Sequence, residues 1–336
     1  MAEKILLTGG AGYIGSHTYC ELVANGFEVV ILDNFSNARP DVLDRLEVIA
    51  GGPVTCYTGD VLDRAMLDRI FAEHQIAAVI HFAALKAVGE SAEKPLDYIK
   101  TNVSGLINLL DAMRDADVWR LVFSSSATVY GEPEVLPIPE TAPRGYTNTY
   151  GFTKLVSEQS LEQIAESDPR WAFGVLRYFN PAGAHETGLI GEDPNDIPNN
   201  LMPYIAKVAT GDLERLSVFG GDYDTPDGTG VRDYIHVVDL AFGHVQSVRA
   251  LIDTGESHTV NLGTGTGYSV LDMLKAYERA CGHSLAYVIA PRRPGDVAST
   301  YADPTKAGEV LGFQTRRDLD DMCESSWNWV SRRKNT

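Results

Sequence analysis

Short apolar runs alternate with longer stretches of helical periodicity through the first half of the chain. In the run that contains Ala78, Val79 and Ile80, no polar residues alternate with the apolar ones, which is typical of a strand covered by helices on both faces. Such runs, separated by helices, predict an α/β fold with a doubly wound parallel sheet. The predicted strands are residues 4–8, 28–32, 54–57, 77–82, 121–124 and 173–177.

The second half of the chain has a different character. Proline, asparagine, aspartate and glycine accumulate between Pro181 and Gly230, which predicts long loops that carry function. Helices are then expected at residues 237–251, 270–280 and 319–330, and strands at 258–262 and 286–289. We therefore expect a first domain at 1–180 and a smaller, mixed α/β substrate domain mainly at 181–336. Residues of about 231–262 are expected to return to the first domain.

Composition and charge exclude several functions. The chain has 336 residues, 44% of them hydrophobic, which is enough for a substantial core. A formal net charge of −18 repels nucleic acid and anionic membrane surfaces, so neither is expected as a partner, and an anionic ligand needs a local basic pocket. The 4 cysteines are far apart in the sequence, and the 8 histidines lack the spacing of metal ligands, so no metal is expected.

The N-terminal apolar stretch is too short for a signal peptide, and no apolar run reaches the ~18 residues of a membrane span. The scattered cysteines favour a reducing compartment. These features predict a cytoplasmic protein.

A glycine-rich turn, Thr8-Gly-Gly-Ala-Gly-Tyr-Ile-Gly15, follows the first predicted strand and opens a helix. This is the position of the dinucleotide fingerprint of a Rossmann domain, in which glycines allow a tight turn and a close approach of the pyrophosphate. The next strand ends at Asp33, where a carboxylate receives the adenosine ribose hydroxyls and repels the extra phosphate of NADP. The sequence therefore predicts bound NAD.

Tyr150 and Lys154 lie four positions apart, and a run of three serines ends the fifth predicted strand at Ser126. On a helix, this spacing places the ammonium beside the phenol, where its charge is expected to lower the tyrosine pKa. Tyr150, Lys154 and Ser126 are the predicted catalytic residues. The predicted cofactor contacts are Gly9, Gly12, Tyr13, Ile14, Gly15, Asp33, Asn34, Asp60, Val61, Phe82, Ala83, Ala84, Lys86, Ser124, Tyr150, Lys154 and Tyr178.

Together, the glycine turn, the serine run, the Tyr-Lys pair and the segment from Leu176 to Ala184 resemble the extended short-chain dehydrogenase/reductase family. The segments 191–193, 197–204, 227–237 and 290–296 closely resemble the UDP-glucose 4-epimerase family within it, and the match covers nearly the whole chain. This resemblance implies an isomerase of galactose metabolism that interconverts UDP-galactose and UDP-glucose. Tyr150 would remove the 4-hydroxyl proton as hydride passes to tightly bound NAD. The 4-keto sugar would then rotate and regain the hydride on its opposite face.

The resemblance also implies the substrate contacts. Arg232 and Arg293 would bind the diphosphate, Phe219 would lie near the uracil and Asp296 on its ribose. The full set is Lys86, Ser126, Tyr150, Asn180, Asn200, Leu201, Phe219, Arg232, Arg293, Asp296 and Thr300. Asn180 before Pro181 is also compatible with a turn cap, Phe219 with the core, and Asp296 with pairing to arginines, but contact with the substrate is favoured for all three. The family implies a homodimer, for which the apolar stretch 95–113 offers a surface or, alternatively, an ordinary sheet-covering helix.

Two other functions remain open at this stage. A nucleotide-sugar 4,6-dehydratase shares the first oxidation step. Relatives of that type have a sequence resembling Thr-Asp-Glu where this chain has Ser126-Ala127-Thr128, and the missing carboxylates argue against this function. A non-catalytic NAD-binding regulator should lack the proton-transfer residues, which are present here. Thr300 takes the place of a bulky tyrosine in some members of the family, so UDP-N-acetylglucosamine and UDP-N-acetylgalactosamine are also candidate substrates. The motifs leave the range of sugars, pentoses included, open.

Overall fold

The computed structural model describes residues 2–195, 200–293 and 296–334. Its centre is a seven-stranded sheet in the order β10-β6-β5-β4-β1-β2-β3, in which every strand pairs in parallel with its neighbours. The predicted doubly wound sheet is therefore confirmed. The bounds of the strands are β1 Lys4–Thr8, β2 Glu28–Asp33, β3 Thr55–Thr58, β4 Ile76–His81, β5 Arg120–Ser126, β6 Ala172–Tyr178 and β10 His258–Leu262.

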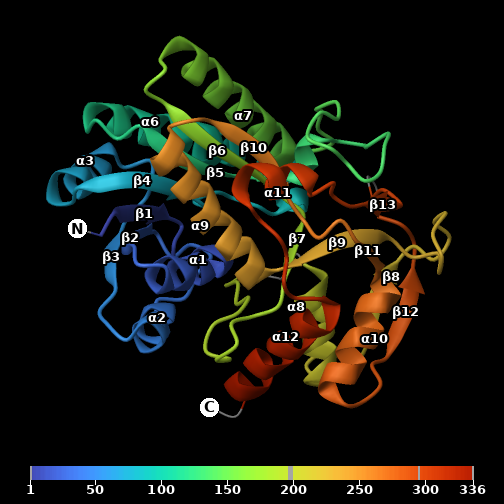
Figure 1. Cartoon of the computed structure of the whole chain (residues 1–336). Coiled ribbons are helices and arrows are strands. Elements are labelled where there is room, and N and C mark those ends of the chain that lie inside the picture. The colour runs from blue at the N-terminus through green and yellow to red at the C-terminus, as the bar shows by residue number, and fades with distance from the viewer. Residues whose placement is uncertain (1, 196–199, 294–295, 335–336) are drawn as a thin grey trace.

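Helices cover both faces of this sheet (Figure 1). Along β1, Ile5 and Leu7 face one hydrophobic core while Leu6 faces the other, so all three are buried and no polar alternation remains. One face packs against α1 Tyr13–Ala24, α2 Val42–Ala50, α9 Val237–Thr254 and α11 Thr305–Leu311. The other packs against α3 Arg64–Glu73, α6 Gly105–Asp115 and α7 Thr149–Ser167.

A smaller domain follows, with its own hydrophobic core around Met273, Tyr277 and Met322. It contains a parallel pair, β8 Leu216–Phe219 with β12 Tyr287–Ala290, and a second small sheet in which β9 Val231–His236 pairs with β7 Asn180–Ala182, β11 Gly267–Ser269 and β13 Ser299–Thr300. Its helices are α8 Leu201–Ala209, α10 Val270–Cys281 and α12 Leu319–Lys334. The predicted smaller mixed domain is thus confirmed.

The segments after β9 return to the large sheet. β10 adds to its edge beside β6, and α9 packs on the face that also holds α1. β9 itself belongs to the small sheet. The domain boundaries suggested by the sequence, 1–180 and 181–336, stay a prediction.

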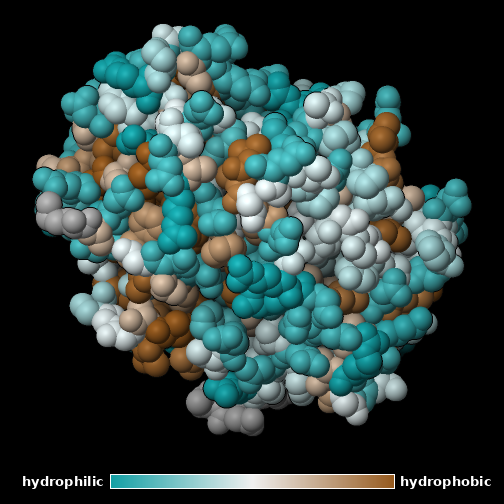
Figure 2. Space-filling view, in the orientation of Figure 1, coloured by the Kyte–Doolittle hydropathy of each residue, from teal (hydrophilic) through white to brown (hydrophobic). Residues whose placement is uncertain are grey.

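The apolar stretch 95–113 divides between core and surface. It contains α5 Pro95–Tyr98, a π-helical turn Ile99–Ser104 and most of α6. Leu106, Leu109 and Leu110 are buried against the sheet, whereas Leu96 is 75% and Ile107 40% exposed. The three leucines of α6 are therefore sheet-covering residues and do not supply a docking surface. Figure 2 shows hydrophilic side chains over most of the visible face, with apolar side chains in small patches.

No helix among the described residues is long and apolar enough to cross a membrane.

A buried ion pair joins α7 to the middle of the sheet. Arg177 on β6 donates to both carboxylate oxygens of Glu158 at 3.0 and 2.7 Å, and both side chains are almost fully buried. The hydroxyl of Ser125 on β5 also donates to Glu158. These contacts satisfy the buried carboxylate from two adjacent strands, and they fix how α7 lies against the sheet.

We predict that Arg177→Met destabilises the fold by about 3–5 kcal/mol, because it leaves the buried Glu158 carboxylate with only the more distant Arg144, at 3.4 Å, as a cation. Urea unfolding measures this loss. Arg279→Met is the matched control, because Arg279 pairs with Asp320 at the solvent-exposed surface and its removal should barely change the unfolding midpoint. Equal, small shifts in both variants would contradict the prediction.

Candidate active site

The glycine turn joins β1 to α1 by close backbone packing. Gly9 has a φ of 71°, and its N–H donates to the Leu32 carbonyl at 2.8 Å. A Cβ on Gly9 would lie 2.7 Å from the backbone nitrogen of Ala83, and one on Gly15 would lie 2.4 Å from the Gly9 carbonyl oxygen. Larger residues at these two positions would therefore separate β1, β4 and α1.

The N-terminus of α1 suits an anionic group. Gly12, the N-cap, provides no side-chain cap, and the first turn contains no acidic residue. Helix N–H donors and the positive end of the helix dipole are therefore not neutralised by the chain's own side chains at this end. Phosphate oxygens of a dinucleotide are the ligands that such a terminus prefers.

Asp33 ends β2 beside this turn. Its carboxylate accepts hydrogen bonds from the backbone N–H groups of Ala11, at 2.9 Å, and Phe35, at 2.8 Å. Burial raises the pKa of Asp33, while these backbone hydrogen bonds oppose the shift. Next to it, Asn34 donates to the Asp60 carboxylate at 2.9 Å, which joins the ends of β2 and β3.

All the residues predicted to contact the cofactor line one cleft at the carboxyl ends of the strands. This first cleft contains Gly9, Gly12, Tyr13, Ile14, Gly15, Asp33, Asn34, Asp60, Val61, Phe82, Ala83, Ala84, Lys86, Ser124, Tyr150, Lys154 and Tyr178. Further lining residues that the sequence reasoning missed are Leu32, Ser36, Asn37, Ala38, Gly59, Leu85, Thr101 and Ser125. Ser36, Asn37 and Ala38 follow shortly after Asp33, and this position could have identified them as cleft residues. Thr101 has no motif around it, so its place in the cleft could not be predicted.

Helix α7 delivers Tyr150 and Lys154 to this cleft. Asn148 caps the helix by accepting from the Gly151 N–H at 2.8 Å, which fixes Tyr150 in the first turn. Ser126, at the end of β5, is the neighbouring side chain that lowers the pKa of the Tyr150 phenol. One turn on, the Lys154 ammonium donates to the Ser124 carbonyl at 2.5 Å and lies 3.4 Å from the Ser124 hydroxyl. The three predicted catalytic residues are thus brought together.

The electrostatics of this group differ from the expectation for Tyr150. Burial raises the pKa of Tyr150 to about 12, and the neighbouring Ser126 is the opposing influence. Burial also lowers the pKa of Lys154 to about 7, although the charge of Glu158 opposes this shift. The ammonium binds Ser124 and lies 5.8 Å from the centre of the Tyr150 ring. In this structure desolvation therefore outweighs the charge of Lys154 in setting the pKa of the phenol.

A second cleft lies in the smaller domain and contains most of the predicted substrate residues: Asn180, Asn200, Leu201, Phe219, Arg232, Arg293 and Asp296. Arg293 donates to Asp296 at 3.0 Å and stacks over the Phe219 ring at 4.9 Å. Arg232 lies 4.0 Å from Asp296. Thr300 pairs with Arg232 across β13 and β9 but does not line this cleft.

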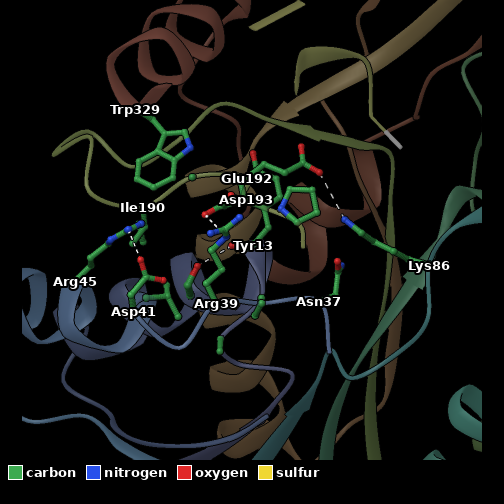
Figure 3. Close-up of a pocket in the computed structure, with 17 residues that line it drawn as sticks. Tyr13, Asn37, Arg39, Asp41, Arg45, Lys86, Ile190, Glu192, Asp193 and Trp329 are labelled. Carbon is green, nitrogen blue, oxygen red and sulfur yellow. Dashed lines mark hydrogen bonds and ion pairs between the residues drawn. The ribbon is translucent and has the colours of Figure 1, made fainter. Parts of the chain in front are cut away.

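A short chain of polar contacts joins the two clefts. Lys86 in the first cleft lies 3.6 Å from the Glu192 carboxylate, and Asn200 in the second donates to Glu192 at 2.7 Å. Figure 3 shows the ends of the Lys86 and Glu192 side chains pointing toward each other, with Tyr13 below Glu192. Burial raises the pKa of Glu192, and the charge of Lys86 opposes this. Residues 197–199 of the predicted motif 197–204, and residues 294 and 295 of the motif 290–296, lie outside the described residues.

Within the described parts of the chain, no group of three or more His, Cys, Asp and Glu side chains is placed to hold a metal ion. The cysteines Cys20, Cys56, Cys281 and Cys323 are free thiols.

Comparisons with known proteins agree with this geometry. The sequence model of the family described as GDP-mannose 4,6 dehydratase matches residues 6–326. The UDP-glucose 4-epimerase of Bacillus subtilis is 56% identical over 97% of this chain and 96% of its own length.

Two solved structures are close to this fold. The UDP-glucose 4-epimerase of Stenotrophomonas maltophila, with bound NAD and formylated UDP-arabinopyranose, has a TM-score of 0.97 at 49% identity over 99% of both chains. The enzyme of Bifidobacterium longum, in complex with NAD+ and UDP, has a TM-score of 0.94 at 54% identity, again over 99% of both chains.

The fold and the site thus define an extended short-chain dehydrogenase/reductase, with a dinucleotide-binding sheet and a Tyr-Lys pair at its carboxyl edge. Within that class, the chain belongs to the UDP-glucose 4-epimerase family.

The low pKa of Lys154 predicts a pH-dependent stability. Its folded-state pKa is about 7, whereas an unfolded lysine titrates at about 10.4, so between these values the unfolded chain binds more protons. The free energy of unfolding should therefore rise with pH across this window, by at most about 1.4 kcal/mol per pH unit from this group.

Lys154→Met removes this contribution, so urea unfolding at several pH values should show a smaller rise in the variant and a more stable variant near pH 7. The same slope in both proteins would refute the prediction.

Proposed function

We propose that this chain is an NAD-dependent epimerase that interconverts UDP-galactose and UDP-glucose by inverting C4 of the sugar. The observation that carries the proposal is the placement of Tyr150 and Lys154 in the first cleft, which the Lys86–Glu192–Asn200 contacts connect to the second. A nucleotide in the first cleft and a UDP-sugar reaching from the second would meet at Tyr150.

The first cleft fits NAD. The uncapped start of α1 suits the pyrophosphate, and the buried carboxylate of Asp33 suits ribose hydroxyls and opposes the extra phosphate of NADP. The structures from Stenotrophomonas maltophila and Bifidobacterium longum contain this cofactor. When bound, NAD supplies the acceptor and donor of the hydride at C4.

The residues of this chain handle the proton. Tyr150 takes the proton of the sugar 4-hydroxyl, and Ser126, the neighbouring side chain that lowers the pKa of Tyr150, holds the same oxygen. Burial places the pKa of Tyr150 at about 12, so the phenol enters the cycle protonated unless positive charge next to it increases. Lys154, which Ser124 fixes one helical turn from Tyr150, is placed to hold the ribose, and the positive charge that NAD would supply would add to that of its ammonium.

The second cleft suits the UDP part of the substrate. Arg232 and Arg293 supply guanidinium groups for the diphosphate in a protein whose net charge is −18. Phe219 is 40% exposed and offers its ring to the uracil, and Asp296 offers its carboxylate to the uridine ribose. Asp296 already pairs with Arg293, so ribose binding has to share or replace this ion pair. Binding energy then concentrates away from the sugar, which leaves the 4-keto hexose free to rotate.

We also propose a homodimer that uses the exposed apolar residues of the α5–α6 region, Leu96, Ile99 and Ile107. The free thiols support the cytoplasmic location expected from the sequence.

Neither alternative has comparable support. A 4,6-dehydratase needs an acid/base pair for elimination, but Ala127 and Thr128 stand beside Ser126, and the nearby Glu158 is bound by Arg177 and Ser125. The dehydratase name describes the matched family model as a whole, whereas the relatives of high identity are UDP-glucose 4-epimerases. A non-catalytic regulator does not need Tyr150, Ser126 and Lys154 brought together at the ends of the strands.

The function is tested by proton NMR of UDP-galactose incubated in heavy water with the purified protein and no added cofactor. We expect UDP-glucose without deuterium at C4, because hydride returns to the same molecule. Tyr150→Phe should lower kcat by about 10²–10⁴-fold, whereas Tyr146→Phe, an exposed tyrosine, should not. A 6-deoxy-4-keto product with deuterium at C5 would indicate a dehydratase, and no turnover even with added NAD would refute the epimerase.

The sugar range gives a further prediction. Thr300 is a small residue directly opposite Arg232, so we expect the chain to convert UDP-N-acetylglucosamine as well. Thr300→Tyr should abolish this reaction and retain most of the turnover of UDP-galactose. An unmodified protein that converts UDP-galactose but not UDP-N-acetylglucosamine would contradict the prediction.

A further inference from the structure

Residues 192–195, in the loop between β7 and α8, bridge the two sides of the first cleft. In the large sheet, β1 stands between β4 and β2, so the glycine turn after β1 has a loop on each side. We call residues 82–87 the β4 lip and residues 34–39 the β2 lip. The segment 192–195 contacts both lips.

Glu192 makes the contact with the β4 lip. Its carboxylate lies 3.6 Å from the Lys86 ammonium, and the same oxygen accepts from Asn200 in the second cleft at 2.7 Å. Only 9% of the Glu192 side chain is exposed, so water screens this ion pair less than a pair at the open surface. This end of the segment is therefore fixed between the two clefts.

Asn195 makes the contact with the β2 lip. Its amide nitrogen lies 3.1–3.4 Å from three backbone carbonyl oxygens, those of Phe35, Ser36 and Ala38. Carbonyl oxygens only accept, so the NH2 group faces the lip and shares its two protons among them. Ser36 and Ala38 also line the first cleft, so Asn195 holds a loop that belongs to the cofactor site.

Helix α12 of the smaller domain anchors the segment. Asp193 accepts from Arg333 on α12 and lies 3.3 Å from Arg39 of the β2 lip, so one carboxylate joins the two domains. Beside it, Gly191 packs so closely on Trp329 of α12 that a Cβ would lie 2.4 Å from the ring carbon Cδ1. A side chain at Gly191 would therefore push the segment away from its anchor.

A small cavity lies between the segment and the glycine turn (Figure 3). It is lined by Gly12 at the N-terminus of α1, by Arg39 and Lys86 of the two lips, and by Glu192 and Asp193 of the segment. Figure 3 shows Glu192 directed toward Lys86 and Asp193 directed toward Arg39. The helix terminus that suits a pyrophosphate thus faces a space that the segment covers.

We propose that Glu192 and Asn195 are positioning residues that hold the segment 192–195 across the first cleft and thereby retain NAD. Release of a dinucleotide from beneath the segment requires at least one of its two ends to detach. Retention matters for the reaction, because the sugar can be completed only if the cofactor stays in place between the two hydride transfers. The proposal deepens the proposed function and rests on it for the presence of NAD in the first cleft.

Two substitutions detach the two ends separately. Asn195→Asp keeps the size of the side chain but replaces the donor by a carboxylate, which the three carbonyl oxygens of the β2 lip repel. Glu192→Gln keeps an acceptor for Asn200 but removes the charge that attracts Lys86.

Each substitution has a matched control at the surface. Asn328→Asp makes the same change at an exposed asparagine that donates to the Glu186 carbonyl at 3.2 Å. Glu73→Gln makes the same change at an exposed glutamate that pairs with Arg69 at 2.8 Å. Neither Asn328 nor Glu73 lines either cleft.

The first measurement is the exchange of bound NAD. The NAD-loaded protein is mixed with an excess of ¹³C-labelled NAD, and the label in the protein fraction is followed by mass spectrometry after rapid desalting. Exchange should be about tenfold faster in Asn195→Asp, which loses hydrogen bonds and gains repulsion, and about threefold faster in Glu192→Gln, which loses a partly exposed ion pair. Both controls should exchange NAD at the rate of the unmodified protein.

The second measurement separates retention from a general loss of stability. Hydrogen–deuterium exchange of the NAD-loaded Asn195→Asp protein should be faster at the β2 lip and unchanged in the central strands β4 and β5, whereas a merely structural role of Asn195 would accelerate it throughout the sheet. An unchanged rate of NAD exchange in Asn195→Asp would overturn the proposal. Equal acceleration in Asn195→Asp and Asn328→Asp, or faster hydrogen exchange in the central strands, would overturn it too.

Neither measurement uses turnover of a sugar. A chain that exchanges NAD as expected but does not convert UDP-galactose supports the retention role and refutes only the epimerase. A purified protein that contains no NAD, and binds none when it is added, refutes both.

Discussion

The docking of α7 through the buried Glu158–Arg177 pair is the constraint on which the site depends. Tyr150, Lys154 and Glu158 follow one another at intervals of four along the helix, so they share one face. Glu158 is held by Ser125 of β5 and Arg177 of β6, which fixes both the rotation and the height of the helix above the strands. Lys154 then reaches Ser124, and Tyr150 reaches Ser126, because each lies one turn nearer the carboxyl edge.

This arrangement buries charge at a cost that the surrounding polar groups only partly offset. Glu158 has a full set of donors and belongs to a satisfied ion pair. Lys154 has neutral contacts, chiefly the oxygens of Ser124 and the Phe123 ring 4.9 Å from its ammonium, and burial lowers its pKa toward neutrality. A lysine in this state responds strongly to any change in its few acceptors. Sensitivity of this kind is useful at a site where the charge next to Tyr150 has to favour the phenol in one half of the reaction and the phenolate in the other.

Local patterns predicted the features that depend on short stretches of chain. The glycine turn, Asp33 at the end of β2 and the Tyr150–Lys154 spacing follow from backbone geometry and helix periodicity, and the structure brings these residues to one cleft. Contacts between side chains that are far apart in the sequence leave no local pattern from which they could be predicted. Tyr178 and His244, or Lys86 and Glu192, meet only because β6, α9 and the loop after β7 pack around the same strand ends.

The pKa of Tyr150 shows why residue types alone were misleading at this point. A lysine one turn away suggests a lowered phenol pKa, but the ammonium is turned to Ser124, and desolvation raises the pKa instead. Likewise, the apolar periodicity of 95–113 could not tell a docking surface from a sheet cover, because both use the same spacing. Leu106 and Leu109 proved to cover the sheet, while Leu96 remained exposed.

The two clefts differ in how their ligands have to be held, and the structure reflects this difference. In the first cleft, the backbone determines much of the shape. Gly9 and Gly15 leave no room for a side chain, and two backbone N–H groups fix the Asp33 carboxylate. Such contacts cannot rearrange without moving β1 or α1, which suits a cofactor that stays bound through many turnovers. In the second cleft the contacts are made by side chains: Arg293 donates to Asp296, and Arg232 donates to the Val231 carbonyl and lies 4.0 Å from Asp296. They can exchange these bonds for a diphosphate and release it again, which suits a substrate that has to leave.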